Sequence, residues 1–200
     1  MAVEPHVVTG HEAATATGLD NRKVGMWAFL GSECLFFGAM ISTYLLYRNR
    51  VLEGPRLADV YDIPYTSVSA FVLLMSSVTM VLALAAIQRG EHRALRVWLM
   101  ATALLGLVFV GGQAFEFTEF VQHGFTFRSS VAGSAFFMLT GFHGAHVTVG
   151  VLMLLGLVYL SVLGKLPTHD SLRVELIGLY WHFVDIVWIV IFTIVYLFPQ

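Results

Sequence analysis

An apolar run near the end of the chain, residues 174–198, contains two ionisable side chains, His182 and Asp185. The run is long enough to cross a bilayer as a helix, which takes about 20 residues. An ionisable side chain at the centre of a bilayer costs about 2.5–3.5 kcal/mol on insertion scales, so such residues usually face protein or water. Because His182 and Asp185 are three residues apart, they share one helical face. They therefore either pair with polar groups on a neighbouring helix or handle ions or protons.

A second pair, His143 and His146, lies in the apolar run 131–163. If this helix neighbours the helix of 174–198, three imidazoles and one carboxylate come together, a set that can bind Zn or Fe. The spacing alone is a weak indication of a metal, because four ligands must also converge in space. A proton relay is a second alternative. We favour a third, an interhelical polar cluster held by hydrogen bonds and formed by His143, His146, His182 and Asp185.

Small residues also recur in the run 131–163 at a spacing of four. Thr140, Gly144 and Thr148 form this stripe. Small side chains let the backbones of two membrane helices approach closely. The stripe therefore predicts a helix-packing contact on this face.

Three carboxyl groups lie within or beside the other apolar runs. Glu33 is about nine residues inside the run 24–47, or ~13 Å along a helix. Phenylalanines flank it, and desolvation there favours a neutral carboxyl. We interpret Glu33 as a buried protonatable site; the alternative is a neutral side chain that only hydrogen-bonds a neighbour. Glu116 and Glu119 follow the run 95–115, and we expect these acids at the outer end of the span.

The composition indicates an integral membrane protein. The 200 residues are 58% hydrophobic and 12% charged, with a mean hydropathy of +0.78, whereas soluble domains are about 25% charged. The net charge of -2 gives no information about partners, and the sequence has no basic patch that would indicate nucleic acid. Cys34 is the only cysteine, which excludes a disulfide within the chain.

Five apolar runs predict an all-α polytopic membrane protein with five transmembrane helices, because backbone groups in lipid must bond within their own segment. We expect a polar flexible tail over 1–23 and a single transmembrane domain over 24–198. The expected helices cover residues 24–47, 66–88, 95–115, 131–163 and 174–198.

The orientation follows from the distribution of Lys and Arg. Seven lie on the side that holds the N-terminus, and four on the other side. Basic residues concentrate in cytoplasmic loops. We therefore expect a cytoplasmic N-terminus and an outside C-terminus.

Four strings carry a resemblance to a known family. They are Gly141–Gly150 (GFHGAHVTVG), Tyr180–Trp188 (YWHFVDIVW), Ser32–Phe37 (SECLFF) and Gln113–Glu116 (QAFE). In this order they resemble subunit III of the haem-copper respiratory oxidases, the cytochrome c oxidase subunit III family. The resemblance covers about residues 22–198 and implies the five-helix form, which lacks the two N-terminal helices of longer members.

The resemblance implies a non-redox subunit of a proton-pumping terminal oxidase in the bacterial cytoplasmic membrane. In this family the complex reduces oxygen to water in aerobic electron transport, and haem and copper belong to the partner subunits I and II. Subunit III has no cofactor, metal or catalytic residue of its own. It packs on subunit I, supports proton uptake, stabilises turnover and contacts membrane lipids. Bound phospholipid and a larger respiratory supercomplex are further expectations from the family.

Within the family, the electron donor differs between branches. Glu33 matches a buried acidic residue of the family, and glutamate at this place favours the cytochrome c branch. The alternatives are subunit III of a quinol oxidase and the subunit associated with nitric oxide reductase. A stand-alone transporter is a distant alternative, because the sequence shows no clear internal repeat.

Overall fold

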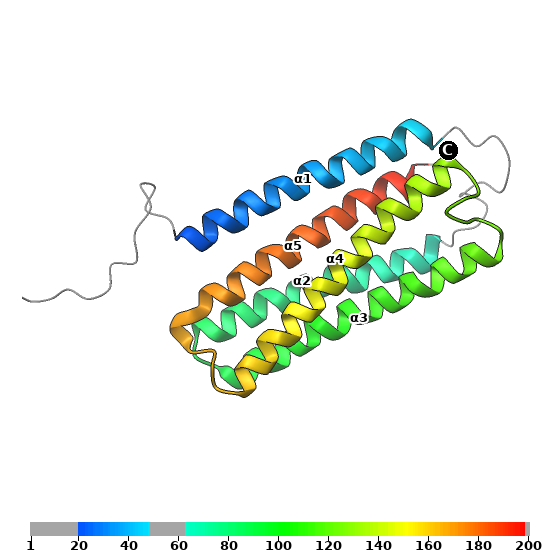
Figure 1. Ribbon diagram of the computed structural model, residues 1–200. Coiled ribbons are helices and arrows are strands. Elements are labelled where there is room, and N and C mark those ends of the chain that lie inside the picture. The colour runs from blue at the N-terminus through cyan, green and yellow to red at the C-terminus, as the bar shows by residue number, and fades with distance from the viewer. Residues whose placement is uncertain (1–19, 49–62, 199–200) are drawn as a thin grey trace, which may run out of the picture.

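The computed structural model describes residues 20–48 and 63–198, which form a bundle of helices (Figure 1). The five long helices are α1 (Asn21–Tyr47), α2 (Ile63–Gln88), α3 (His92–Gln122), α4 (Val131–Val162) and α5 (Ser171–Phe192). All five are long and apolar enough to cross a membrane. The predicted all-α fold with five membrane-spanning helices is therefore confirmed for the described part of the chain. Which terminus faces the cytoplasm stays a prediction.

Several helix ends differ from those expected: α2 and α3 begin at Ile63 and His92, about three residues earlier. Helix α1 begins three residues earlier, because the side chain of Asp20 accepts a hydrogen bond from the backbone N–H of Arg22 at 2.8 Å and caps the helix. The expected tail over 1–23 otherwise lies outside the described residues. Helix α3 continues to Gln122 instead of ending near residue 115. Its last turns hold buried side chains, so the acidic residues there do not mark the end of the helix.

The last expected helix, 174–198, is regular over only part of its length. A 3₁₀ turn, Thr168–Asp170, precedes α5, and a π-helical turn, Thr193–Leu197, follows it. The π-helical turn still buries two side chains, Val195 and Tyr196. The polypeptide therefore continues to pack against the bundle beyond the end of the α-helix.

Helices α2 and α3 form a tight hairpin. Gly90 in the connection has a φ of 77°, a left-handed conformation that glycine adopts at little cost. The backbone N–H of Glu91 then bonds the carbonyl of Ala86 at 2.9 Å, and that of Gly90 bonds Ile87 at 3.0 Å. This arrangement satisfies carbonyl groups at the end of α2 and directs the chain into α3.

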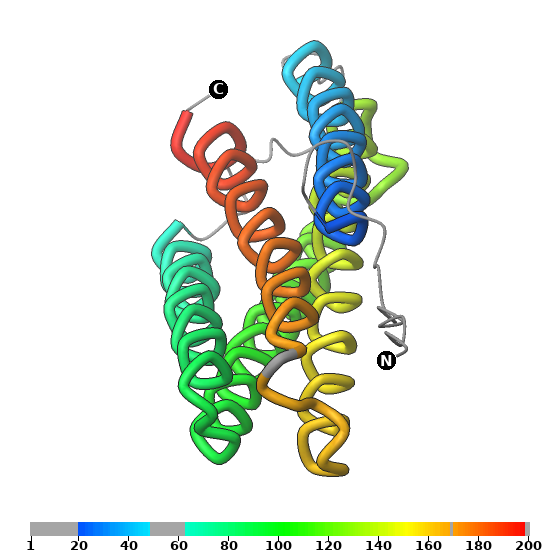
Figure 2. Tube along the Cα trace, turned by 90° about the vertical axis from the view of Figure 1, so that its left-hand side faces the viewer, coloured from blue at the N-terminus to red at the C-terminus, as the bar shows by residue number. Residues whose placement is uncertain are grey.

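Helix α1 lies along one side of the bundle, where it packs on α4 and α5 (Figures 1 and 2). Only 11% of its most apolar stretch is buried, whereas the corresponding share is 33–44% in the other four helices. Most of α1 is therefore available to lipid or to a partner protein.

Trp181 of α5 lies at the centre of the bundle and connects its neighbouring helices. Its indole ring lies so close to Gly106 of α3 and Gly150 of α4 that an added Cβ would approach ring carbons to 2.5 and 2.8 Å. The ring nitrogen donates to Ser76 Oγ of α2 at 2.9 Å. One buried side chain thus contacts three neighbouring helices, and the two glycines leave the room that it needs.

Candidate functional site

His146 of α4 and Glu33 of α1 face each other inside the membrane-spanning region. The distance from His146 Nε2 to Glu33 Oε2 is 3.2 Å, and the two side chains are 19% and 17% exposed. The contact is within ion-pair distance, but Glu33 Oε2 has no hydrogen-bond partner among the described residues. Both residues were predicted from the sequence as candidate site residues, but their pairing was not. Glu33 is also less deeply buried than expected, because α1 lies at the side of the bundle.

The other ring nitrogen of His146 fixes the tautomer. Nδ1 lies 2.7 Å from the backbone carbonyl of Phe142. Because a carbonyl oxygen only accepts, Nδ1 must carry a hydrogen, and Nε2 is left to face Glu33. With one further proton, the couple is either imidazole and carboxylic acid or imidazolium and carboxylate. Both forms have zero net charge, so the couple can hold a proton without placing a net charge in the apolar span.

Aromatic groups hold the imidazole of His146 in place. The ring of Phe37 meets it edge-on at 5.0 Å between centroids. Tyr180 of α5 donates its hydroxyl to the backbone carbonyl of His146 at 3.0 Å. Phe29 of α1 stacks on Tyr180 at 6.3 Å. Three helices therefore contribute to the position of the couple.

His182 and Asp185 of α5 bind a different helix. Both contact Ser77 of α2: Ser77 Oγ donates to Asp185 Oδ2 at 2.5 Å, and His182 Nδ1 lies 3.2 Å from the same oxygen of Ser77. Since the single hydroxyl proton of Ser77 goes to Asp185, the oxygen of Ser77 accepts from His182. Ser77 was not among the residues predicted from the sequence. The one feature of the sequence that could have indicated its role is a hydroxyl side chain within the apolar run 66–88.

His143 has no part in either polar contact. It is fully buried, and neither ring nitrogen has a hydrogen-bond partner among the described residues. Its ring stacks on Trp188 at 4.9 Å and 23°, and Phe109 meets it edge-on at 5.9 Å. His143 therefore packs as an aromatic side chain in the core.

The predicted cluster of four residues is thus not a single hydrogen-bonded unit. His146 faces Glu33 of α1, His143 faces the core, and His182 and Asp185 bond to α2. The reason is geometric, because residues three apart on a helix point about 60° apart at 3.6 residues per turn. In the part of the chain that the structure describes, no group of three or more His, Cys, Asp or Glu side chains is placed to hold a metal ion.

The small-residue stripe of α4 meets α3. Gln113 Nε2 donates to the carbonyl of Thr140 at 2.9 Å, and its side-chain oxygen lies 2.5 Å from where a Cβ on Gly144 would be. Thr148 is exposed and bonds the carbonyl of Gly144 within its own helix. Two of the three positions therefore face a close neighbour, and that neighbour is α3.

The two acids after the third apolar run differ in environment. Glu116 is buried, with 6% of its surface exposed, and accepts from Thr66 Oγ1 at 2.6 Å. Tyr196 of the π-helical turn lies 3.5 Å from its second oxygen. Glu119 is exposed. Glu116 therefore joins three segments inside the bundle, and only Glu119 is free to reach an interface.

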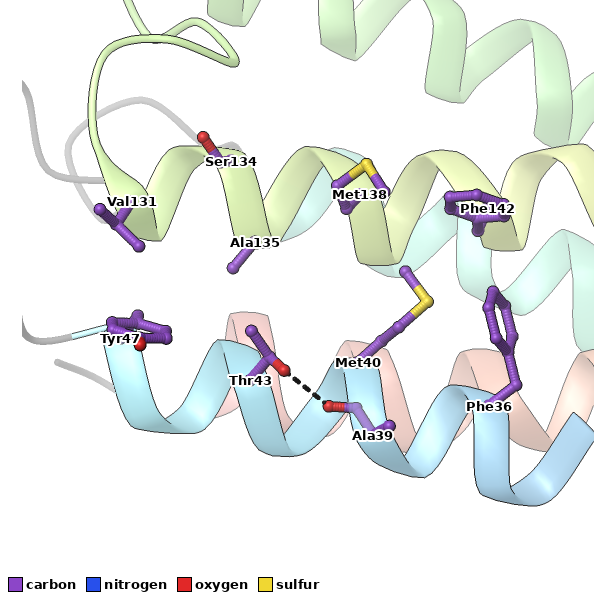
Figure 3. A pocket seen from close by; sticks show the side chains of 10 residues that line it. All are labelled: Phe36, Ala39, Met40, Thr43, Tyr47, Val131, Ser134, Ala135, Met138 and Phe142. Atoms are coloured by element: carbon purple, nitrogen blue, oxygen red, sulfur yellow. Dashed lines mark hydrogen bonds between the residues drawn. The ribbon is translucent and has the colours of Figure 1, made fainter.

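An apolar groove of about 460 Å³ lies between α1 and α4 (Figure 3). Met40 and Phe36 of α1 extend toward α4 in this view, opposite Met138 and Phe142. The full lining is Phe36, Ala39, Met40, Thr43, Tyr47, Val131, Ser134, Ala135, Met138 and Phe142. An apolar groove of this kind on a membrane-spanning surface can accommodate a hydrocarbon chain.

Comparison with known proteins assigns the family. The family model for cytochrome c oxidase subunit III matches residues 1–200, so the chain belongs to this family. Cytochrome c oxidase subunit 3 of Bacillus sp. (strain PS3) is 36% identical over 177 residues, which cover 88% of this chain and 86% of the relative. Quinol oxidase subunit 3 of Bacillus spizizenii is 37% identical over 175 residues, covering 87% and 85%. Cytochrome bo(3) ubiquinol oxidase subunit 3 of Pseudomonas aeruginosa is 36% identical over 187 residues, covering 94% and 89%.

The family and the fold agree. A haem-copper oxidase subunit III is a multi-pass membrane protein that belongs to a complex with other oxidase subunits, and the five spanning helices fit this class. The comparisons therefore confirm the resemblance drawn from the four sequence strings.

Proposed function

We propose that this chain is a non-redox subunit III of a proton-pumping terminal oxidase in the bacterial cytoplasmic membrane. Its complex would reduce oxygen to water, with haem and copper held by partner subunits. This chain would pack mainly on subunit I, contact subunit II and support proton uptake and stable turnover. Membership of the subunit III family supports the assignment to such a complex.

The His146–Glu33 couple is the observation that supports a role in proton uptake. It places two protonatable groups 3.2 Å apart within the spanning region, between α1 and α4. With its shared proton the couple has zero net charge, so it can hold one proton at low electrostatic cost; release of that proton leaves one carboxylate charge between α1 and α4. Neither group needs a redox centre for this role.

The exposed side of α1 and the groove beside it provide surface for partners and lipid. We propose that an acyl chain of a bound phospholipid occupies the apolar groove between α1 and α4. The lining of aliphatic, aromatic and thioether side chains supports this assignment. A respiratory supercomplex would form through the remaining exposed surface.

The electron donor of the proposed complex is cytochrome c. Glu33 supports this branch through its match to the family. Quinol oxidation is the second candidate, because the relatives named for cytochrome c and for quinol are equally similar, at 36–37% identity.

The experiment is purification of the complex through an affinity tag on this chain. We expect two redox subunits to co-purify, a reduced-minus-oxidised spectrum of haem, and oxidation of reduced cytochrome c. Oxidation of quinol in place of cytochrome c would select the second candidate. A chain that purifies alone, without haem, would contradict the proposed function.

A further inference from the structure

A small cavity of about 70 Å³ lies between α2 and α5, separate from the groove beside α1. Glu175 and His182 lie at opposite ends of its length, because they are seven residues, or about 10 Å, apart along α5. The remaining lining is apolar: Met80, Val81, Leu84, Gly178 and Leu179. Val81 is 54% exposed, so the cavity also opens along the outer face of α2. It is a narrow passage along α5 with an ionisable group at each end.

The Glu175 end opens at the edge of the bundle. Glu175 lies in the first turns of α5, and its side chain is 35% exposed. It forms a 2.7 Å ion pair with Lys23 near the start of α1. A charged pair at this position marks contact with water, so the passage begins at the aqueous boundary.

The His182 end continues into a chain of hydrogen bonds. His182 Nδ1 donates to Ser77, and Ser77 donates to Asp185 Oδ2. This leaves Nε2 as the ring nitrogen available to the cavity. Asp185 is 5% exposed, and its other oxygen, Oδ1, has no hydrogen-bond partner among the described residues. Burying a carboxyl oxygen without a hydrogen-bond partner costs free energy, unless the oxygen takes up a proton or binds a water molecule.

The size of the cavity suits water. A cavity needs about 10–15 Å³ to hold one water molecule, together with polar partners. The volume of 70 Å³ therefore accommodates a short file of waters between Glu175 and His182. Gly178 keeps the passage open, since an added Cβ would come 3.2 Å from the terminal carbon of Met80.

We propose that this cavity is a water-filled inlet that opens where α5 begins and ends at His182, with a proton relay from there to Asp185. A proton from water binds Nε2 of His182, and the Nδ1 proton passes to Ser77 Oγ. The Ser77 hydroxyl proton passes to the carboxylate of Asp185. The reverse sequence returns the proton to water. The inlet involves α2 and α5, so it stands apart from the His146–Glu33 couple and does not depend on the proposed electron donor.

Thiol accessibility tests the inlet directly. Methanethiosulfonate reagents attack the thiolate, which forms in water and not in hydrocarbon. In a Cys34→Ser background, Leu179→Cys and Leu84→Cys each place a thiol in the cavity lining. Val149→Cys is the matched control, because Val149 is 50% exposed on α4 and the adjacent Gly150 contacts Tyr180 and Trp181, at the depth of the inlet.

The complete complex is treated in native membranes with a charged, impermeant reagent, from one side at a time, and the modification rate is followed by mass. We expect the cavity cysteines to react at least about tenfold faster than Val149→Cys, and only from the side where α5 begins. Gly178→Leu is then combined with each cavity cysteine in turn. It should reduce the modification rate of Leu179→Cys more than that of Leu84→Cys, because Leu179 lies deeper in the cavity. Equal rates at the cavity and control positions, or reaction only from the opposite side, would overturn the inlet.

Discussion

The imidazole of His146 bonds its own helix through one nitrogen and faces Glu33 through the other. The first contact is 2.7 Å from Nδ1 to the carbonyl of Phe142, and the second is 3.2 Å from Nε2 to Oε2 of Glu33. As a result, the ring cannot turn away from α1 without losing a hydrogen bond inside α4. The orientation of the ring therefore keeps Nε2 directed at Glu33 across the contact between α1 and α4.

This relationship predicts the reactivity of Glu33 toward a hydrophobic carbodiimide, which needs a protonated carboxyl in surroundings poor in water. In His146→Leu the carboxyl loses its basic neighbour and keeps the shared proton, so labelling of Glu33 should increase. Labelling should be lost in Glu33→Gln, while the complex still assembles. Peptide mapping by mass spectrometry measures both results. Glu175→Gln is the control and should leave labelling at Glu33 unchanged; a decrease in His146→Leu would contradict the pairing.

The packing of Trp181 predicts a steric effect at Gly106. In Gly106→Ala the new Cβ would lie 2.5 Å from a ring carbon of Trp181 and 2.9 Å from Val151. Overpacking of this kind costs about 1–3 kcal/mol, which a denaturant titration of the purified subunit in detergent measures. Gly111→Ala on the same helix has no neighbour within 4 Å of the added carbon. That control should be neutral or stabilising, and equal destabilisation of both variants would disprove the explanation.

The hydroxyl of Ser77 predicts a second stability effect. Ser77→Ala removes the only hydrogen-bond partner that Asp185 Oδ2 has among the described residues, and leaves a buried carboxyl unsatisfied at a cost of about 1–3 kcal/mol. The same titration measures the loss. Ser42→Ala is the matched control, since Ser42 is exposed and bonds only a carbonyl of its own helix. If both serine variants unfold at the same denaturant concentration as the unmodified chain, the bridge between α2 and α5 contributes no stability.

The distribution of basic residues predicts the topology. A reporter that is active only outside the cytoplasm should be active when fused after Gln200 and silent when fused at Glu91. The positive-inside rule gives the physical reason, because basic loops are retained on the cytoplasmic side. Activity at Glu91 with silence at Gln200 would reverse the orientation.

The helices could be predicted from the sequence because each apolar run must satisfy its backbone within the membrane. The end of α3 could not, since Glu116 resembles a residue at the boundary and is in fact buried against Thr66. Only the neighbouring helix shows that this carboxyl has a partner.

The candidate polar residues could also be found from the sequence, but not their partners. His146 and His143 are three residues apart, and the 60° between them is enough to turn one toward Glu33 and the other toward Trp188. Ser77 was missed because a serine in an apolar run has no function that its type alone reveals. Its role depends on which face of α2 meets α5.

The most direct test of the proposed function compares the complete oxidase with an oxidase from which this subunit has been removed. Without the subunit, turnover should begin near the normal rate and then decay faster, and proton uptake should be slower at high pH. This result is expected because no redox ligand is assigned to this chain. If the depleted oxidase had no initial activity while its haem spectrum stayed intact, this subunit would have to be part of the catalytic centre, and the account would be contradicted.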